Sequence, residues 1–282
     1  MNEIQSNFKQ YDLDDDDIRI LGSEPRRSRR WPVVAVIAAL AVAAAVVLWL
    51  VLKPEEEAPV ADSTPTQEIP SPQKAGCLIT DTVLGENSIR IIVPSGTPQL
   101  HVGALSPESD STIVLAAEAA FYRKDNGQIS GAYILKGDQL SRGYSSLGYC
   151  AIINGKISLG NAKSTSLFEE ATETEGYFFR QKPLVDNSKA VYEENSRRNP
   201  KQKSQRRALA MKDGVAMVVL CDTPIVLNEF ADLLCQLGVE QAIGLSGSIS
   251  FGFARDFDNN TLYWGMQNST NAEGTNFIVW VK

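Results

Sequence analysis

Small hydroxyl side chains concentrate in one short segment, residues 246–250, which reads Ser-Gly-Ser-Ile-Ser. The segment follows an apolar run, and side chains this small would let backbone N–H groups approach a phosphate closely. A Ser/Gly turn between two strands explains the same residues without a ligand, and the bare pattern favours that interpretation. If the segment does bind a ligand, we expect Gly247, Ser248 and Ser250 to contact it.

One arginine opens a strand that leads toward this segment. The guanidinium of Arg206 offers a planar pair of donors that suits two phosphate oxygens. Arg206 also lies in a basic run with Lys201, Lys203 and Arg207, where a surface arginine is the simpler interpretation. Arg206 is therefore a candidate ligand-binding residue with a structural alternative.

Few side chains could transfer protons or hold a metal ion. His101 is the single histidine, which excludes Ser-His-Asp and Cys-His triads and sites with several histidine ligands. The four cysteines are spread singly, without a Cys-x-x-Cys pair, which excludes zinc-ribbon and thioredoxin-like sites. We expect no metal site and no cofactor. Buried free thiols are the default for Cys221 and Cys235, although three complete disulfide pairings stay open outside the cytoplasm.

The elements that would position these residues are mostly short strands. Residues 206–211 and 215–221 are predicted to pair around a turn at Asp213-Gly214, and a second hairpin is predicted at Asn154-Gly155. Further strands are expected at residues 88–93, 111–115, 131–135 and 276–281. Strands outnumber helices and no regular βαβ repeat appears. The predicted class is therefore α+β, a mixed and mostly antiparallel sheet with few helices.

Two helices are expected in this part of the chain. Residues 226–237 carry apolar side chains at a spacing of three to four, which is typical of a helix with one buried face. Thr223 can cap its start, and Gly238 suits the left-handed position after its end. A short helix is also predicted at residues 166–172.

An unbroken apolar run at residues 33–52 predicts a transmembrane helix, because 20 residues span about 30 Å of hydrocarbon. Four arginines precede the run and three glutamates follow it, so the positive-inside rule places the N-terminus in the cytoplasm. A cleaved signal peptide is the alternative, but the run and the arm before it are long for one. A buried core helix fits poorly, since every face is apolar.

Four regions follow from this anchor. We expect a disordered cytoplasmic arm at residues 1–30, acidic and then basic; the membrane span at 31–53; a proline-rich stalk at 54–76; and a globular domain at 77–282, outside the cytoplasm and periplasmic in a bacterium. The arm could dock a cytoplasmic partner. The net charge of −7 argues against nucleic acid as a partner.

The order of elements from residue 206 to 250 resembles the C-terminal half of the phosphodiester glycosidase family. That family typically has an Arg-Thr-Ala strand, a turn at Asp-Gly, a helix ending in Leu-Gly, and then Asn-Leu-Asp-Gly-Gly-x-Ser. The residues that match this pattern are Arg206, Ala208, Asp213, Gly214, Leu237, Gly238, Leu245, Gly247 and Ser250. A second match is residues 118–122, Glu-Ala-Ala-Phe-Tyr, where the family typically has Asn-Gly-Gly-Phe-Phe. The resemblance implies the family's fold and a sugar phosphate or cell-surface glycan as ligand.

The resemblance also gives the candidate catalytic residues. Ser246 stands at the family's aspartate position, Glu118 at its asparagine position, and Ser248 at its second glycine. Cleavage of a glycosyl phosphodiester usually needs a proton donor or acceptor, or a nucleophilic carboxylate. The groups left for that work are Glu118, Asp222 and hydroxyls, although an aspartate at a helix start is commonly structural. This pattern implies a protein that binds its ligand with weak or no hydrolysis, and the alternative is an active hydrolase that uses a relocated acid.

Overall fold

The structure is a computed structural model of the 282-residue chain, and it describes residues 75–123, 126–143, 146–191, 202–247, 249–266 and 275–282. The described residues belong to one compact unit. The predicted arm, the predicted membrane span and nearly all of the predicted stalk lie outside them. No helix in these described ranges is long and apolar enough to cross a membrane.

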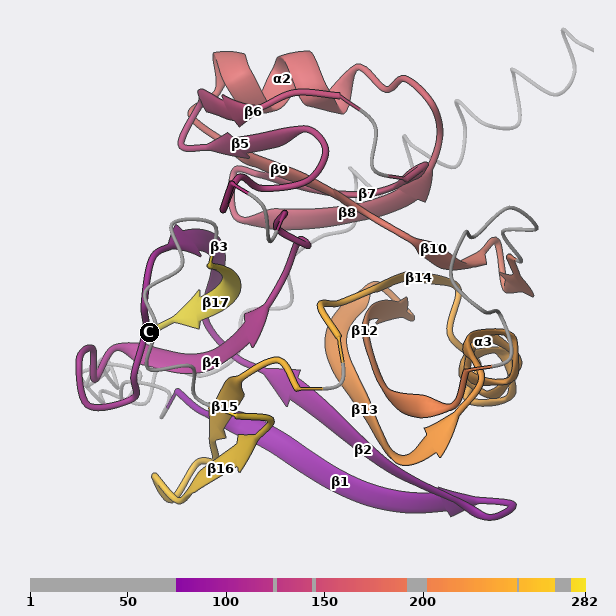
Figure 1. The fold of residues 1–282 in the computed structure, drawn as a ribbon. Coiled ribbons are helices and arrows are strands. Elements are labelled where there is room, and N and C mark those ends of the chain that lie inside the picture. Colours follow the sequence, from indigo (N-terminus) through magenta and orange to yellow (C-terminus); the bar gives the residue numbers. More distant parts are fainter. Residues whose placement is uncertain (1–74, 124–125, 144–145, 192–201, 248, 267–274) are drawn as a thin grey trace, which may run out of the picture. The chain divides into compact units, whose positions relative to one another are not determined.

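The largest sheet has seven antiparallel strands in the order β1-β2-β13-β12-β14-β10-β11 (Figure 1). Its strands are β1 (Cys77–Leu84), β2 (Asn87–Pro94), β13 (Val215–Ile225), β12 (Ser204–Lys212), β14 (Gln241–Gly244), β10 (Pro183–Asp186) and β11 (Lys189–Ala190). Helix α3 (Leu227–Gln236) packs on one face of this sheet through its buried Phe230 and Leu234.

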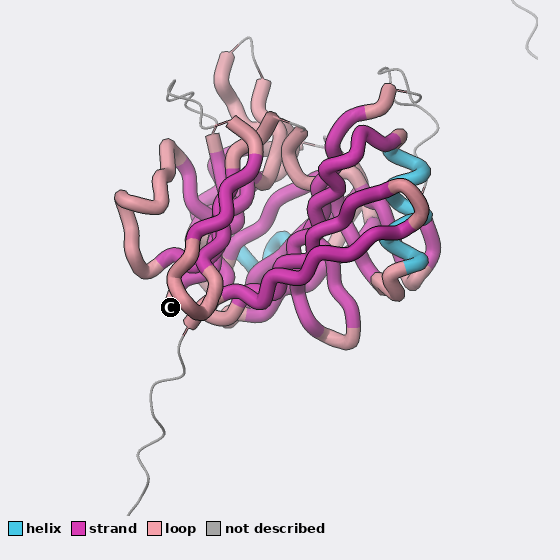
Figure 2. The backbone as a smooth tube through the Cα atoms, turned by 90° about the horizontal axis from the view of Figure 1, so that it is seen from below, coloured by secondary structure: helices cyan, strands magenta, loops and turns pink. Residues whose placement is uncertain are grey.

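Two five-stranded antiparallel sheets complete the described fold. One has the order β16-β15-β4-β17-β3 and the other β6-β5-β9-β7-β8. The first comprises β16 (Thr261–Trp264), β15 (Gly252–Arg255), β4 (Ile113–Glu118), β17 (Asn276–Val281) and β3 (Thr97–Val102). The second comprises β6 (Asp138–Ser141), β5 (Tyr133–Leu135), β9 (Tyr177–Gln181), β7 (Gly148–Ile153) and β8 (Lys156–Asn161), with helix α2 (Leu167–Glu173) packed on it. Strands dominate the backbone in Figure 2, and the described residues hold two helices, which confirms the predicted α+β class.

Both predicted hairpins are confirmed. Asn154 and Gly155 have φ values of 51° and 73°, and Asp213 and Gly214 have 51° and 73°. A two-residue turn with positive φ at both positions matches the right-handed twist of the strands that it joins. These turns set the registers of β7 with β8 and of β12 with β13.

The start of helix α3 differs from its prediction. Strand β13 continues to Ile225, so Val226 occupies the N-cap and makes no side-chain capping bond. The hydroxyl of Thr223 instead accepts a hydrogen bond from the N–H of Ser88 at 3.0 Å, because Thr223 is still part of the sheet. The predicted end is confirmed, since Gly238 has a φ of 78°.

The two faces of the large sheet pack into different apolar clusters. Leu209 and Leu220 belong to the main cluster, which unites all three sheets, whereas Ala208 and Cys221 belong to the cluster under helix α3. Side chains alternate between the two faces along each strand. Neighbouring residues of β12 therefore point into different environments, which decides where each arginine of this strand lies.

Candidate functional site

The two segments that match the family motifs lie side by side, although more than 100 residues separate them in the sequence. Strands β4 and β15 are neighbours in one sheet, with Ala117 opposite Gly252. Where the ladder ends, the N–H of Ser246 donates to the carbonyl oxygen of Glu118 at 3.3 Å, and the N–H of Glu118 donates to the carbonyl oxygen of Phe251 at 3.3 Å. Residues 118–122 and 246–250 thus begin from one junction.

The side chain of Glu118 is part of this junction. Glu118 is only 8% exposed, and its carboxylate accepts a hydrogen bond from the N–H of Phe251 at 3.1 Å. Burial raises the pKa of Glu118, and the hydrogen bond from Phe251 N–H, the nearby hydroxyl of Ser250 and the charge of Arg207 oppose that rise. The carboxyl group therefore holds its proton to higher pH than an exposed glutamate, and its oxygens are used to join two segments.

Arg207, not Arg206, is the arginine that reaches residues 246–250. Its guanidinium is buried and donates a hydrogen bond to the carbonyl oxygen of Gly247, and its own carbonyl accepts one from Leu245 N–H at 3.0 Å. Burial lowers the pKa of Arg207 to about 10, while the negative charges of Asp222 and Glu118 act against this shift. At neutral pH Arg207 remains a cation.

Arg206, the residue expected to bind a ligand, lies on the opposite face of β12. Its guanidinium donates to the carbonyl oxygens of Ile225 at 3.1 Å and Gln202 at 2.8 Å. It shares its face with Ala208, which packs under helix α3. Adjacent residues of a strand point to opposite faces, so Arg206 and Arg207 lie in different environments, and a ligand-binding role for Arg206 stays a prediction.

Asp222 lies at the end of a row of alternating charges on the large sheet. Asp81 and Arg90 are paired across β1 and β2, with 2.6 Å from Arg90 Nε to Asp81 Oδ1. Asp222 Oδ2 lies 4.0 Å from Arg90 Nη1, and the side chain of Asp222 is about half-exposed. Its charge also acts on Arg207, which in turn acts on Glu118. Asp222 is thus placed as a partner of two arginines.

One carbonyl group, that of Gly247, accepts several hydrogen bonds in the described part of this segment. The carbonyl oxygen of Gly247 accepts hydrogen bonds from Ser250 N–H at 3.0 Å, from Ser250 Oγ at 2.6 Å and from Arg207. Ser246 and Ser250 are both buried, whereas a Cβ placed on Gly247 would meet no atom of the other described residues within 4 Å. Open space at Gly247 permits a ligand to approach the backbone there. Ser248 lies outside the described residues.

Two buried amide side chains, which sequence reasoning missed, hold the other segment. Asn276 is 1% exposed; its Oδ1 accepts from Ala120 N–H at 2.8 Å and its Nδ2 donates to Ala120 O at 3.0 Å. Gln181 Nε2 donates to Ala119 O at 3.2 Å. An amide that opens an apolar strand was the only sequence signal for Asn276. These bonds hold the backbone of Ala119 and Ala120, the two positions at which the family typically has the more flexible glycine.

The cavities found among the described residues lie away from the junction of residues 118–122 and 246–250. Two cavities have volumes of about 530 and 180 Å³, and neither is lined by Glu118, Arg207 or Ser246. No group of three or more His, Cys, Asp or Glu side chains is placed to hold a metal ion among the residues that the structure describes. Chemistry at the junction would depend on one buried carboxyl group, one buried guanidinium and backbone groups.

The chain is similar to proteins of one family. Residues 111–276 match the phosphodiester glycosidase family. The fold is similar to that of the catalytic domain of zebrafish N-acetylglucosamine-1-phosphodiester alpha-N-acetylglucosaminidase, auto-inhibited by its pro-peptide, with 12% identity, a TM-score of 0.54, and coverage of 74% of this chain and 83% of that chain. A hypothetical protein from Synechocystis matches with 13% identity and a TM-score of 0.47, over 73% of this chain and 62% of that chain. No curated protein matches.

The residues that match the family include the two segments that the structure brings together. The matched residues span more than half of the chain and contain both segments that meet at Glu118 and Ser246. The solved zebrafish domain shares the fold. This chain therefore belongs to the phosphodiester glycosidase family.

Proposed function

We propose that this domain binds a sugar phosphate or cell-surface glycan at residues 246–250 and hydrolyses it weakly or not at all. One observation carries the proposal: Ser246 occupies the family's aspartate position, and the nearest buried carboxylate, Glu118, is bonded to the N–H of Phe251. A carboxylate that joins two segments is poorly placed to move toward a substrate. Binding would instead use the backbone around Gly247, where an added Cβ would meet no atom of the other described residues.

The charge at the junction favours an anionic ligand. Arg207 is a buried cation whose guanidinium reaches the carbonyl of Gly247, so a phosphate at this turn would lie in a positive field. The zebrafish enzyme acts on an N-acetylglucosamine-1-phosphodiester, which makes N-acetylglucosamine 1-phosphate the natural first ligand to test. Nucleic acid is disfavoured by the net charge of −7.

The alternative is an active hydrolase that uses Glu118 as a relocated acid. Its burial raises the pKa, which keeps the group protonated to higher pH, as a general acid requires. Asp222 is a weaker candidate because it is half-exposed beside Arg90. A general acid or base contributes about 10²–10⁴-fold in rate, so an active Glu118 would be readily detected by mutation.

Turnover and binding by the full-length chain separate these two functions. The substrates are a chromogenic N-acetylglucosamine phosphodiester and, for binding, N-acetylglucosamine 1-phosphate. We expect saturable binding to the wild type, and weaker binding to Arg207→Gln. Turnover by the wild type should be near background. Any gain in turnover should come with Ser246→Asp. Wild-type turnover that Glu118→Gln abolishes would establish the hydrolase instead. Arg206→Gln is the matched control, because it removes the same charge from the other face of β12.

We also propose that residues 33–52 anchor the chain as a single transmembrane helix, with the family domain outside the cytoplasm, in the periplasm if the cell is bacterial. The apolar length and the arginines before it support this topology. Protease added to intact cells or spheroplasts should degrade the domain and spare residues 1–30. Protection of the domain would contradict the topology. In the proposed topology the acidic arm, residues 1–30, faces the cytoplasm, and cross-linking in intact cells would capture its partners there.

A further inference from the structure

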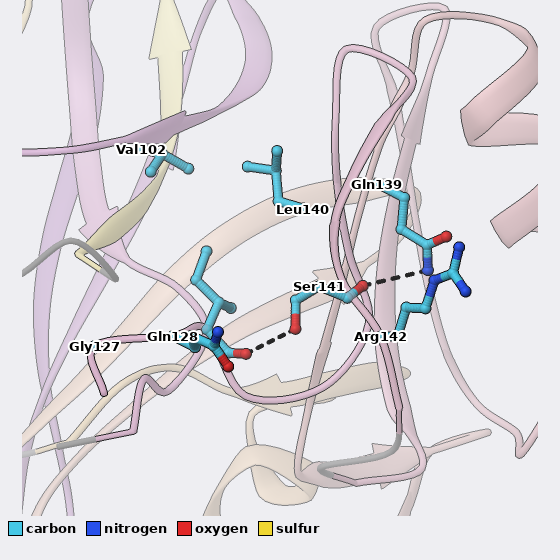
Figure 3. Close-up of a pocket in the computed structure, with 8 residues that line it drawn as sticks. Val102, Gly127, Gln128, Gln139, Leu140, Ser141 and Arg142 are labelled. Carbon is cyan, nitrogen blue, oxygen red and sulfur yellow. Dashed lines mark hydrogen bonds between the residues drawn. The ribbon is translucent and has the colours of Figure 1, made fainter. Parts of the chain in front are cut away.

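A cavity of about 530 Å³ opens between strand β3, the turn after residue 126, and strand β6 (Figure 3). Its lining includes Val102, Gln128, Gln139, Leu140, Ser141 and Arg142. This volume falls in the range of small-molecule sites, about 300–1,000 Å³. None of the residues assigned above to the junction lines it. The cavity is therefore a separate place for a ligand.

We propose that this cavity binds a saccharide that carries an anionic group, either a carboxylate or a phosphate. The charge of the lining supports this class. Among the described residues that line the cavity, Arg142 is the one that carries a charge, in a protein of net charge −7. In the described part of the chain Arg142 has no hydrogen bond or ion pair, so its guanidinium fork is available to bind two oxygens of a ligand.

The remaining lining suits the sugar ring. The amides of Gln128 and Gln139 each offer a donor and an acceptor, the combination that neighbouring sugar hydroxyls require. Gln139 Nε2 makes only a long bond, 3.4 Å, to Ser141 O, while Ser141 Oγ donates to Ile129 O at 2.8 Å and fixes the wall (Figure 3). Leu140 is 49% exposed and gives the apolar surface that the C–H face of a sugar covers.

Other ligand classes fit the lining less well. Single-stranded nucleic acid would need aromatic side chains for base stacking, and none of the described residues that line the cavity is aromatic. A neutral apolar ligand would leave the two amides and the guanidinium without partners, at a cost in free energy. The proposal is independent of the proposed function, because the two sites share no residue.

The test measures binding of three probes to the full-length protein by calorimetry: glucuronic acid, glucose 1-phosphate and glucose. We expect both anionic sugars to bind more tightly than glucose, and the tighter of the two identifies the anion. Arg142→Gln should weaken their binding about tenfold or more, because a hydrogen bond to a charged group is lost. Lys156→Gln, which removes an exposed cation from the same sheet outside the cavity, should leave binding unchanged.

A second variant tests the location rather than the charge. Leu140→Trp places a bulky indole ring in the cavity from a half-exposed position, so it should block all three probes while the protein stays folded. Equal binding by wild type, Arg142→Gln and Leu140→Trp would overturn the proposal. Loss of binding only in Arg207→Gln would also overturn it, since that result assigns the anion to residues 246–250. The absence of saturable binding of every probe to the folded wild type would do the same.

Discussion

Glu118 and Phe251, 133 residues apart in the sequence, are joined by two hydrogen bonds. The carboxylate of Glu118 accepts from the N–H of Phe251 at 3.1 Å, and the N–H of Glu118 donates to the carbonyl of Phe251 at 3.3 Å. The backbone bond continues the ladder between β4 and β15, and the side-chain bond extends it beyond the last strand residue. A carboxylate in this position connects both motif segments, which explains why it can be buried.

Replacing Glu118 should destabilise the protein by an amount that depends on the replacement. Glu118→Ala leaves the buried N–H of Phe251 without an acceptor, so we expect a loss of about 1–3 kcal/mol in the free energy of unfolding. Glu118→Gln keeps an acceptor oxygen and should cost clearly less. Urea denaturation of the full-length chain measures both. Equal losses would mean that the hydrogen bond to Phe251 contributes nothing.

The pH dependence of stability should carry a signature of Glu118. Burial raises its pKa above the ordinary value of 4.5, so the folded state keeps this proton to higher pH than the unfolded state. Its contribution is fully present below about pH 4.5 and is lost as pH rises through the folded pKa. The free energy of unfolding, compared with that of Glu118→Gln across this window, should fall in the wild type alone. Parallel profiles would contradict the shift.

Local patterns predicted the hairpins, whereas the site depended on long-range contacts. Asn154-Gly155 and Asp213-Gly214 specify their turns with two adjacent residues, and the structure confirms both. The role of Arg207 depends instead on which face of β12 meets the other sheets. A sequence shows which residues of a strand share a face, but it does not show which other elements pack on that face. Both faces of β12 are buried, so hydrophobicity gave no signal to distinguish Arg206 from Arg207.

The two arginines should differ in their effect on residues 245–251. Arg207→Gln removes a hydrogen bond from a charged group to Gly247 O, which is worth about 1.5–3 kcal/mol, so amides of this segment should exchange with deuterium about tenfold faster or more. Arg206→Gln removes bonds to Gln202 and Ile225 on the opposite face. It should leave exchange in the segment unchanged. Equal acceleration in both variants would show that neither arginine acts locally.

Asn276 should be as important for residues 119–120 as Glu118 is for residues 246–251. Asn276→Ala leaves the N–H and carbonyl of Ala120 without their partners inside the protein, and each buried unpaired group costs about 1–3 kcal/mol. Asn276→Asp retains the acceptor, but at neutral pH it buries a carboxylate oxygen against Ala120 O, so it should cost at least as much as Asn276→Ala. Denaturant midpoints of the two variants measure this order. Asn87, whose side chain makes one long bond of 3.4 Å to Leu84 O, supplies a mild control as Asn87→Ala.

The four cysteines should react with thiol reagents in an order set by burial. The structure holds all four as free thiols, with Cys77, Cys150 and Cys221 buried and Cys235 half-buried on helix α3. Burial raises the pKa of Cys77 to about 12 and of Cys221 to about 11, so neither provides an accessible thiolate at pH 8. A maleimide should therefore label Cys235 first in the native full-length chain and all four after unfolding, as peptide mass spectrometry would record. Cys235→Ser should abolish the early label. Rapid native labelling of Cys150, which is completely buried, would contradict the packing of the main cluster.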